Sequence, residues 1–175
     1  GEARVEVLLG SLREVVQQAV QAGLEVRGYV STVWVCPYEG DMDIEQTVRV
    51  SDQLLEMGCY EVSLGDTVGR AAPREVESAL RRLLQLAPAD KWALHLHDTC
   101  KTALANVVVG LEAGITCFDA SAGGLGGCPY APGATGNLAT ESLLYLLDRC
   151  GYRTGVDREQ VLLAAQRLRA AMTSD

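Results

Sequence analysis

The sequence has few aromatic side chains and no excess of positive charge. Aromatic residues make up 5% of its 175 residues, and 15 Lys and Arg residues face 23 Asp and Glu residues. The net charge of -8 leaves no basic stripe that could neutralise the phosphates of nucleic acid or of a membrane surface. We therefore expect no nucleic-acid or membrane partner, and any phosphate-bearing substrate must be held locally.

Long apolar runs and the usual nucleotide and zinc patterns are also lacking. No stretch is long enough to cross a bilayer, and the residues that follow Gly1 do not resemble a signal peptide. The glycine-rich segment matches neither G-x-G-x-x-G nor a P-loop and contains no lysine, so a nucleotide-binding fold is not expected. The six cysteines never form a C-x-x-C pair, which excludes zinc ribbons and thioredoxin-like sites, and we expect them to be reduced.

What is present is a regular alternation of helical and strand patterns. Apolar spacing, glycine caps and a proline at a first turn predict helices over 5–22, 44–57, 73–86, 103–113, 138–150 and 157–172. The segments 26–33, 60–64, 92–97 and 116–120 are expected strands. This alternation predicts a single α/β domain over residues 1–175, with parallel strands in a doubly wound sheet or a (β/α) barrel.

Polar residues at the strand ends favour the barrel. Such residues follow all four strands: Glu39, then Asp66 and Thr67, then His97 and Asp98, then Asp119 and Ser121. Barrel enzymes use the carboxyl ends of many strands, whereas a doubly wound sheet usually binds at one switch point. A closed TIM barrel takes eight strands and about 250 residues, so only about half of it is expected here. Either the chain is the carboxyl-terminal half of a longer protein, or copies of it pair.

Two histidines on one predicted strand indicate a metal site. Alternate residues of a strand project to the same face, so His95 and His97 can direct their imidazoles to one point. Asn137, at the end of the glycine-rich segment, is expected to add an amide oxygen. Two nitrogens with oxygen donors suit Mg²⁺ or Mn²⁺ if a carboxylate completes the set, and Zn²⁺ is the competitor.

Two further residues are candidates for catalysis. Cys128 lies between Gly126-Gly127 and Pro129-Tyr130, in a loop whose glycines favour exposure and backbone mobility. Cys36, which is also followed by Pro and Tyr, is the second choice for a reactive thiol. Asp66 is placed either to line the site from a strand end or to serve only as a turn or capping aspartate.

Taken in series, these motifs resemble the 3-hydroxy-3-methylglutaryl-CoA lyase family. The resemblance rests on six segments in order: RGYVS from Arg27, CPYEG from Cys36, SLGDT from Ser63, HLHDT from His95, ALAN from Ala103 and GLGGCPYA from Gly124. It implies a (β/α)8 barrel that splits 3-hydroxy-3-methylglutaryl-CoA into acetoacetate and acetyl-CoA with a divalent cation, in leucine degradation and ketone-body formation. The four strands then correspond to the fifth to eighth of that barrel.

The resemblance also implies residue roles. His95, His97 and Asn137 are expected metal ligands, Cys128 is an expected catalytic residue carried by a closing loop, and Asp66 is expected to line the same site. The family's first strand supplies an Arg-Asp pair that this sequence lacks. Val35 and Cys100-Lys101-Thr102 depart from the family pattern, in which glycine and Tyr-Gly-Gln are expected.

Several alternatives stay open from the sequence. A related acyl-CoA-condensing or aldol enzyme shares the His-x-His strand, and a half-barrel without its first four strands is a candidate for a non-catalytic interaction module. The expected partners are an acyl-CoA substrate and a second copy in a homodimer. The expected compartment is the cytoplasm for a bacterial source and the mitochondrial matrix for a eukaryotic one.

Overall fold

The computed structural model describes residues 2–127 and 136–172, with side chains described from Val5 onward. Its α-helices are α1 (Glu2–Gln21), α2 (Ile44–Met57), α3 (Pro73–Leu83), α4 (Ala103–Glu112), α5 (Thr140–Arg149) and α6 (Arg158–Met172). Its strands are β1 (Arg27–Val30), β2 (Val35–Cys36), β3 (Gly40–Asp41), β4 (Glu61–Asp66), β5 (Trp92–Leu96) and β6 (Cys117–Asp119). Two short 3-10 turns, η1 (Ala89–Lys91) and η2 (Ala122–Gly124), precede β5 and follow β6.

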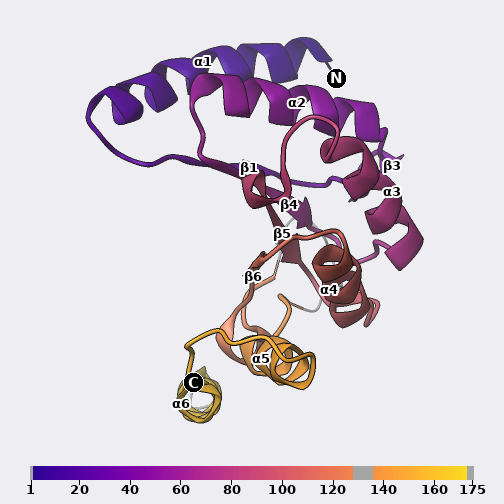
Figure 1. Ribbon diagram of the computed structural model, residues 1–175, viewed down its shortest axis with the longest axis vertical. Helices are drawn as coiled ribbons and strands as arrows, with labels where there is room; N and C mark the ends of the chain where they lie inside the picture. The colour runs from indigo at the N-terminus through magenta and orange to yellow at the C-terminus, as the bar shows by residue number, and fades with distance from the viewer. Residues whose placement is uncertain (1, 128–135, 173–175) are drawn as a thin grey trace.

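Four strands form one parallel sheet in the order β1-β4-β5-β6, while β2 and β3 form a separate antiparallel pair. Within the sheet the spatial order follows the chain order with no reversal. A doubly wound sheet reverses its order at a switch point, so this topology is that of a barrel segment. Figure 1 shows α1 and α2 above the strands, α3 and α4 beside them, and α5 and α6 below, so that the helices follow an arc.

The capping residues explain why the helices between the strands begin and end where they do. The Asp43 side chain accepts a hydrogen bond from the Glu45 backbone N–H at the start of α2, and Gly58 ends that helix with a φ of 107°. Pro73 opens α3 at a position where its missing N–H costs no hydrogen bond. These signals are local, so the predicted bounds of α2 are confirmed and those of the other helices are close.

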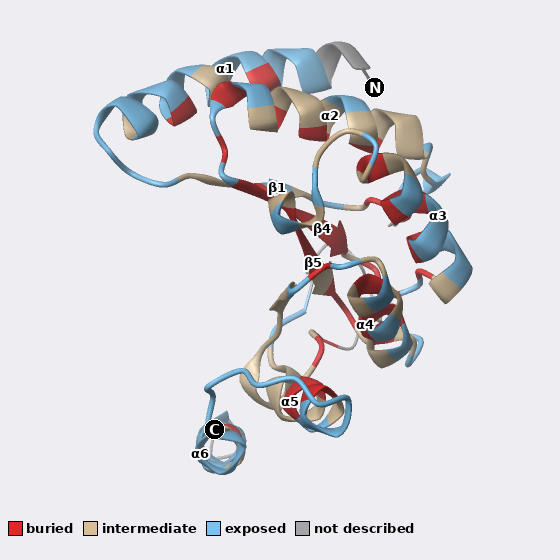
Figure 2. Cartoon of the chain, viewed as in Figure 1, coloured by how far each residue is buried: buried red, intermediate tan, exposed pale blue. Residues whose placement is uncertain are grey.

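The sheet has an apolar face against the helices and a polar face on the other side. The residues that alternate toward the helices are almost completely buried: Val62, Leu64, Trp92, Leu94 and Leu96, each at most 1% exposed. Their alternating neighbours on the other face include Glu61, Ser63 and His95. In Figure 2 the central strands are buried, whereas the outer surface of α1 and most of α6 are exposed.

The first strand is shorter than the sequence pattern predicts. The β-branched segment 26–33 predicts eight residues of strand, but β1 ends at Val30. Thr32 takes a φ of 54°, in the left-handed region, and its backbone N–H donates to Thr67 Oγ1 at 2.9 Å. The chain then forms the β2–β3 hairpin around Cys36, which periodicity over so few residues does not predict.

Within the described ranges, no helix combines the length and the apolar character needed to cross a membrane.

Candidate active site

His95 and His97 lie at the carboxyl end of β5, as the alternation predicts. His95 is paired in register with Gly65 of β4 and Asp119 of β6. His97 follows one residue beyond the strand and forms an isolated antiparallel bridge with Asn137. The two imidazole centroids are 5.5 Å apart. The structure therefore brings all three predicted metal ligands to one end of one strand.

His97 presents an unpaired nitrogen inside the protein. The residue is 5% exposed, and its Nδ1 is buried without a hydrogen-bond partner. Burial, with the nearby His95 as a second cause, lowers the pKa of His97 below its ordinary value of 6.5. A neutral imidazole is the form that binds a metal ion, and a buried nitrogen with no partner is costly unless a ligand satisfies it.

Asn137 is held against β5 by the chain that returns from the glycine-rich segment. The Leu138 N–H donates to the Leu96 carbonyl at 2.9 Å, and the Asn137 Nδ2 donates to the Leu125 carbonyl at 3.0 Å. The amide nitrogen thus points to the loop, which leaves Oδ1 as the group with acceptor capacity. Gly136 has a φ of 80°, and a Cβ there would lie 2.3 Å from the Gly124 carbonyl oxygen. Glycine is required where the two ends of the loop meet.

These three side chains fit a divalent cation, and they do not complete its coordination. The fit rests on the orphaned His97 nitrogen, the two imidazoles and the amide oxygen of Asn137, which are ligands of the kind that Mg²⁺, Mn²⁺ and Zn²⁺ accept. Among the residues that the structure describes, no group of three or more His, Cys, Asp or Glu side chains is placed to hold a metal.

A network of charged and polar side chains on the polar face of the sheet adjoins His95. The Arg27 guanidinium bonds to Glu61 through Nε and to Asp119 Oδ1 through Nη1, the latter at 2.8 Å. Asp119 Oδ2 accepts from the Ser63 hydroxyl at 2.9 Å and lies 3.2 Å from His95 Nδ1. Arg27 also contacts Tyr29 and the Cys117 sulfur. Four strands therefore contribute to a single charged cluster.

The electrostatics of this network keep Asp119 ionised. Burial by itself raises the pKa of Asp119, but hydrogen bonds from His95, Arg27 and Ser63 outweigh it and lower the pKa from 3.8 to about 2. Burial likewise opposes the charge of Arg27, yet its bonds to Asp119 and Glu61 raise the pKa of the guanidinium. Asp119 is accordingly a carboxylate, and Arg27 a cation, throughout the neutral pH range.

The carboxylate of Asp66 contacts a loop rather than the histidines, although the Asp66 backbone carbonyl accepts from the His97 N–H at 3.3 Å. Asp66 is 1% exposed, and its two carboxylate oxygens accept backbone N–H bonds from Gly69, Arg70 and Ala71 at 3.0–3.1 Å. Burial raises the pKa of Asp66, and the three N–H bonds oppose that effect. The arrangement is that of a turn aspartate, one of the two interpretations that the sequence leaves open. A catalytic role for Asp66 stays a prediction.

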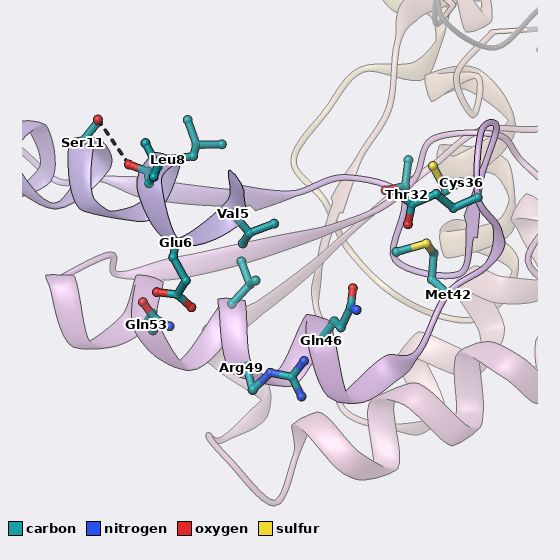
Figure 3. A pocket seen from close by; sticks show the side chains of 13 residues that line it. Val5, Glu6, Leu8, Ser11, Thr32, Cys36, Met42, Gln46, Arg49 and Gln53 are labelled. Carbon is teal, nitrogen blue, oxygen red and sulfur yellow. Dashed lines mark hydrogen bonds between the residues drawn. The ribbon is translucent and has the colours of Figure 1, made fainter. Parts of the chain in front are cut away.

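Cys36 and Glu39 lie at a different place from the histidines. A cavity of about 910 Å³ opens between α1, α2 and the β2–β3 hairpin, and both residues line it. Figure 3 shows the side chains of Val5, Met42 and Arg49 around this cavity, with Thr32 and Cys36 at its hairpin end. His95 and His97 do not line this cavity.

Cys128 lies outside the described residues, and its proximity to the histidines therefore stays a prediction. The other five cysteines are free thiols: Cys36, Cys59, Cys100, Cys117 and Cys150.

The charged cluster was not identified as a unit from the sequence. The sequence patterns place Asp119 at a strand end and Arg27 within a motif, but they predict no role for Glu61. A signal exists in β4, where Glu61 and Ser63 alternate with Val62 and Leu64. Polar residues with period two inside a strand that is buried along its length indicate a polar interior face.

A parallel sheet in barrel order, with two histidines and an asparagine at one strand end, defines a class of (β/α)-barrel proteins. The HMGL-like family model matches residues 3–168, and the chain belongs to this family. The fold is accordingly part of a TIM-type barrel, as predicted.

Named relatives and solved structures agree with this assignment. Hydroxymethylglutaryl-CoA lyase YngG of Bacillus subtilis is 54% identical over 155 residues, which are 89% of this chain and 52% of the relative. The structure of the Bacillus subtilis HMG-CoA lyase superposes with a TM-score of 0.91 at 52% identity, over 94% of this chain and 55% of that one. The structure of an Acinetobacter baumannii HMG-CoA lyase with coenzyme A and 3-methylmalate gives a TM-score of 0.87 at 34% identity, over 94% and 53%. The chain spans about half the length of the curated relatives it matches.

Proposed function

We propose that the protein carrying this chain is a carbon-carbon lyase that cleaves 3-hydroxy-3-methylglutaryl-CoA to acetoacetate and acetyl-CoA. The observation that carries the proposal is the meeting of His95, His97 and Asn137 at the end of β5 in a chain 54% identical to a protein named as that lyase. The names of the relatives favour the lyase over a condensing enzyme or an interaction module. The coenzyme A bound in one similar lyase supports an acyl-CoA substrate.

In this proposal His95, His97 and Asn137 hold a divalent cation, with Mg²⁺ or Mn²⁺ preferred to Zn²⁺. A bound cation would supply Lewis acidity to the substrate hydroxyl and carbonyl oxygens. His97 is buried, and burial lowers its pKa, so its ring presents a nitrogen donor that is already largely removed from water. The returning chain fixes Asn137 beside it through the Leu138–Leu96 hydrogen bond.

The reaction needs one proton removed and one supplied. A base takes the proton of the tertiary hydroxyl, the carbon-carbon bond breaks as that oxygen becomes a ketone, and the carbon left on acetyl-CoA accepts a proton. We propose Cys128 as the acid that supplies this second proton. Near-normal turnover by Cys128→Ser, with unchanged Mn²⁺ affinity, would remove the thiol from the mechanism.

The test of the function is acetoacetate release by the full-length protein from 3-hydroxy-3-methylglutaryl-CoA with added Mg²⁺ or Mn²⁺. We expect His97→Ala to abolish most of the activity and the surface variant Glu45→Gln to retain it. Removal of the metal by a chelator should stop the reaction, and Mn²⁺ should restore it. A parent protein that releases no acetoacetate, or that condenses acyl-CoA substrates instead, would contradict the proposal. A homodimer and the compartment expected from the sequence stay predictions.

A further inference from the structure

The contacts of His95 restrict which of its two ring nitrogens carries a proton. Its Nδ1 lies 3.2 Å from Asp119 Oδ2, and an ionised carboxylate only accepts hydrogen bonds. Arg27 donates to Asp119 Oδ1 at 2.8 Å and Ser63 donates to Oδ2 at 2.9 Å, so both carboxylate oxygens act as acceptors and the hydrogen between Oδ2 and the imidazole belongs to Nδ1. In this Nδ1-protonated tautomer the other nitrogen, Nε2, carries a lone pair.

Asp119 is itself held in place by residues from two other strands. Arg27 of β1 binds one carboxylate oxygen, and Ser63 of β4 donates to the oxygen that also faces His95. The Arg27 side chain is 17% exposed and that of Asp119 is 21% exposed, so water competes weakly for these bonds. Glu61 of β4 fixes the far side of the guanidinium. The carboxylate therefore has little freedom to turn away from the imidazole.

Histidines that bind metals generally donate their second ring N–H to a carboxylate, carbonyl or water, which fixes the tautomer and the orientation of the ring. The Asp119–His95 pair has this arrangement.

We infer that Asp119, clamped by Arg27 and Ser63, is a positioning residue that holds His95 in its Nδ1-protonated tautomer and leaves Nε2 for the divalent cation. This inference rests on the proposed function only for the identity of the ligand at Nε2. Asp119 touches neither substrate nor metal in this arrangement and acts entirely through His95.

The first measurement is the tautomer of His95 in the metal-free, full-length protein. Imidazole ¹⁵N chemical shifts distinguish a protonated from an unprotonated ring nitrogen, and the His95→Gln spectrum identifies the His95 signals. At a pH above the range in which histidine is protonated, we expect Nδ1 to be protonated in the parent. In Asp119→Asn and Asp119→Ala this preference should be lost, because neither side chain offers an anionic acceptor. Unchanged shifts in both folded variants would overturn the inference.

The second measurement is Mn²⁺ affinity, read from the electron paramagnetic resonance signal of free Mn²⁺. Loss of a carboxylate behind a ligating histidine typically lowers metal affinity by about 10- to 100-fold, and we expect this range for Asp119→Ala. Ser63→Ala should have a smaller effect in the same direction. The matched control is Glu45→Gln, which removes a surface carboxylate bonded to Arg82 and should leave the affinity unchanged.

The two measurements separate the inference from the proposed function. Normal Mn²⁺ affinity in a folded Asp119→Ala protein would overturn the positioning role. A parent that binds no Mn²⁺ and releases no acetoacetate would instead overturn the proposed function, and the ¹⁵N comparison would still decide whether Asp119 sets the His95 tautomer.

Discussion

The two faces of the parallel sheet are built by the same strands and held by different forces. Toward the helices, Leu64, Trp92 and Leu94 are fully buried among apolar side chains. On the opposite face, Arg27, Glu61 and Asp119 are joined by directed, charge-assisted hydrogen bonds. In β4 both kinds of residue are buried, one step apart along the chain.

The apolar and polar faces respond differently when one side chain is removed. Apolar burial is roughly proportional to area and has no direction, so a truncation costs the contacts that are lost and the cavity that remains. A polar network fails differently, because removing one member leaves the others buried without a partner. The first face stabilises the fold by burial, and the second holds charged side chains beside His95 by directed bonds.

The largest effect is expected on the apolar face, from Trp92→Ala. Trp92 is fully buried, and its Nε1 donates to the Ala87 carbonyl at 3.0 Å. Truncation should lower the free energy of unfolding by about 3–5 kcal/mol, measured by urea denaturation. Tyr38→Ala, at a side chain that is largely exposed, should change it by no more than about 0.5 kcal/mol. Similar costs for the two variants would contradict the assignment of Trp92 to the core.

On the polar face, Arg27→Met should destabilise by a different route. The change leaves the Glu61 and Asp119 carboxylates without their shared cation, and we expect a loss of about 2–3 kcal/mol near neutral pH. Adding Glu61→Gln should recover part of this loss, because one uncompensated charge is removed.

The matched control for the charged cluster is Arg82→Met. Arg82 bonds to Glu45 in an exposed pair, which should contribute less than about 1 kcal/mol. If Arg27→Met and Arg82→Met lower the free energy of unfolding by the same amount in urea denaturation, the charged cluster around Arg27 would be no stronger than a surface ion pair.

A smaller effect on stability is expected from a substitution at Gly136, which lies against the Gly124 carbonyl. Gly136→Ala should cost about 1–3 kcal/mol, because the residue has a positive φ and its new Cβ would contact the Gly124 carbonyl. Gly155→Ala is the control: Gly155 has a φ of 72°, and a Cβ there would meet nothing within 4 Å. Its cost should therefore be that of backbone strain alone. Differential scanning calorimetry of both variants measures the difference, and equal costs would exclude the close contact at Gly136.

The smallest effect is expected in the rate of thiol alkylation, which should differ between the more buried and the exposed cysteines. Burial raises the pKa of Cys59, and burial with Glu61 as a second cause raises that of Cys117. Since the thiolate is the reactive form, both should alkylate more slowly with iodoacetamide near pH 7 than Cys100 and Cys150, which are exposed. Mass spectrometry of peptides after timed labelling measures the order. Equal labelling of Cys59 and Cys150 in the folded protein would contradict it.

The sequence predicts most of the fold because its signals are local. The alternation of helix and strand, the Asp43 and Gly58 caps of α2, and the four parallel strands all follow from patterns within one element. The shortened β1 does not, because it depends on the left-handed Thr32 and its bond to Thr67, 35 residues away. The hairpin at Cys36 is too short for periodicity to reveal.

For the candidate site, the sequence alone determined the residue types and their alternation: His95 and His97 on one face of a strand, and Asn137 at the end of a glycine-rich segment. Only the tertiary structure decided which groups meet. It placed Asn137 against His97, directed Asp66 to the 69–71 loop, and joined Arg27, Ser63 and Asp119 behind His95. The physical reason is that alternation follows from the geometry of one strand, whereas these contacts depend on the register between strands distant in the chain.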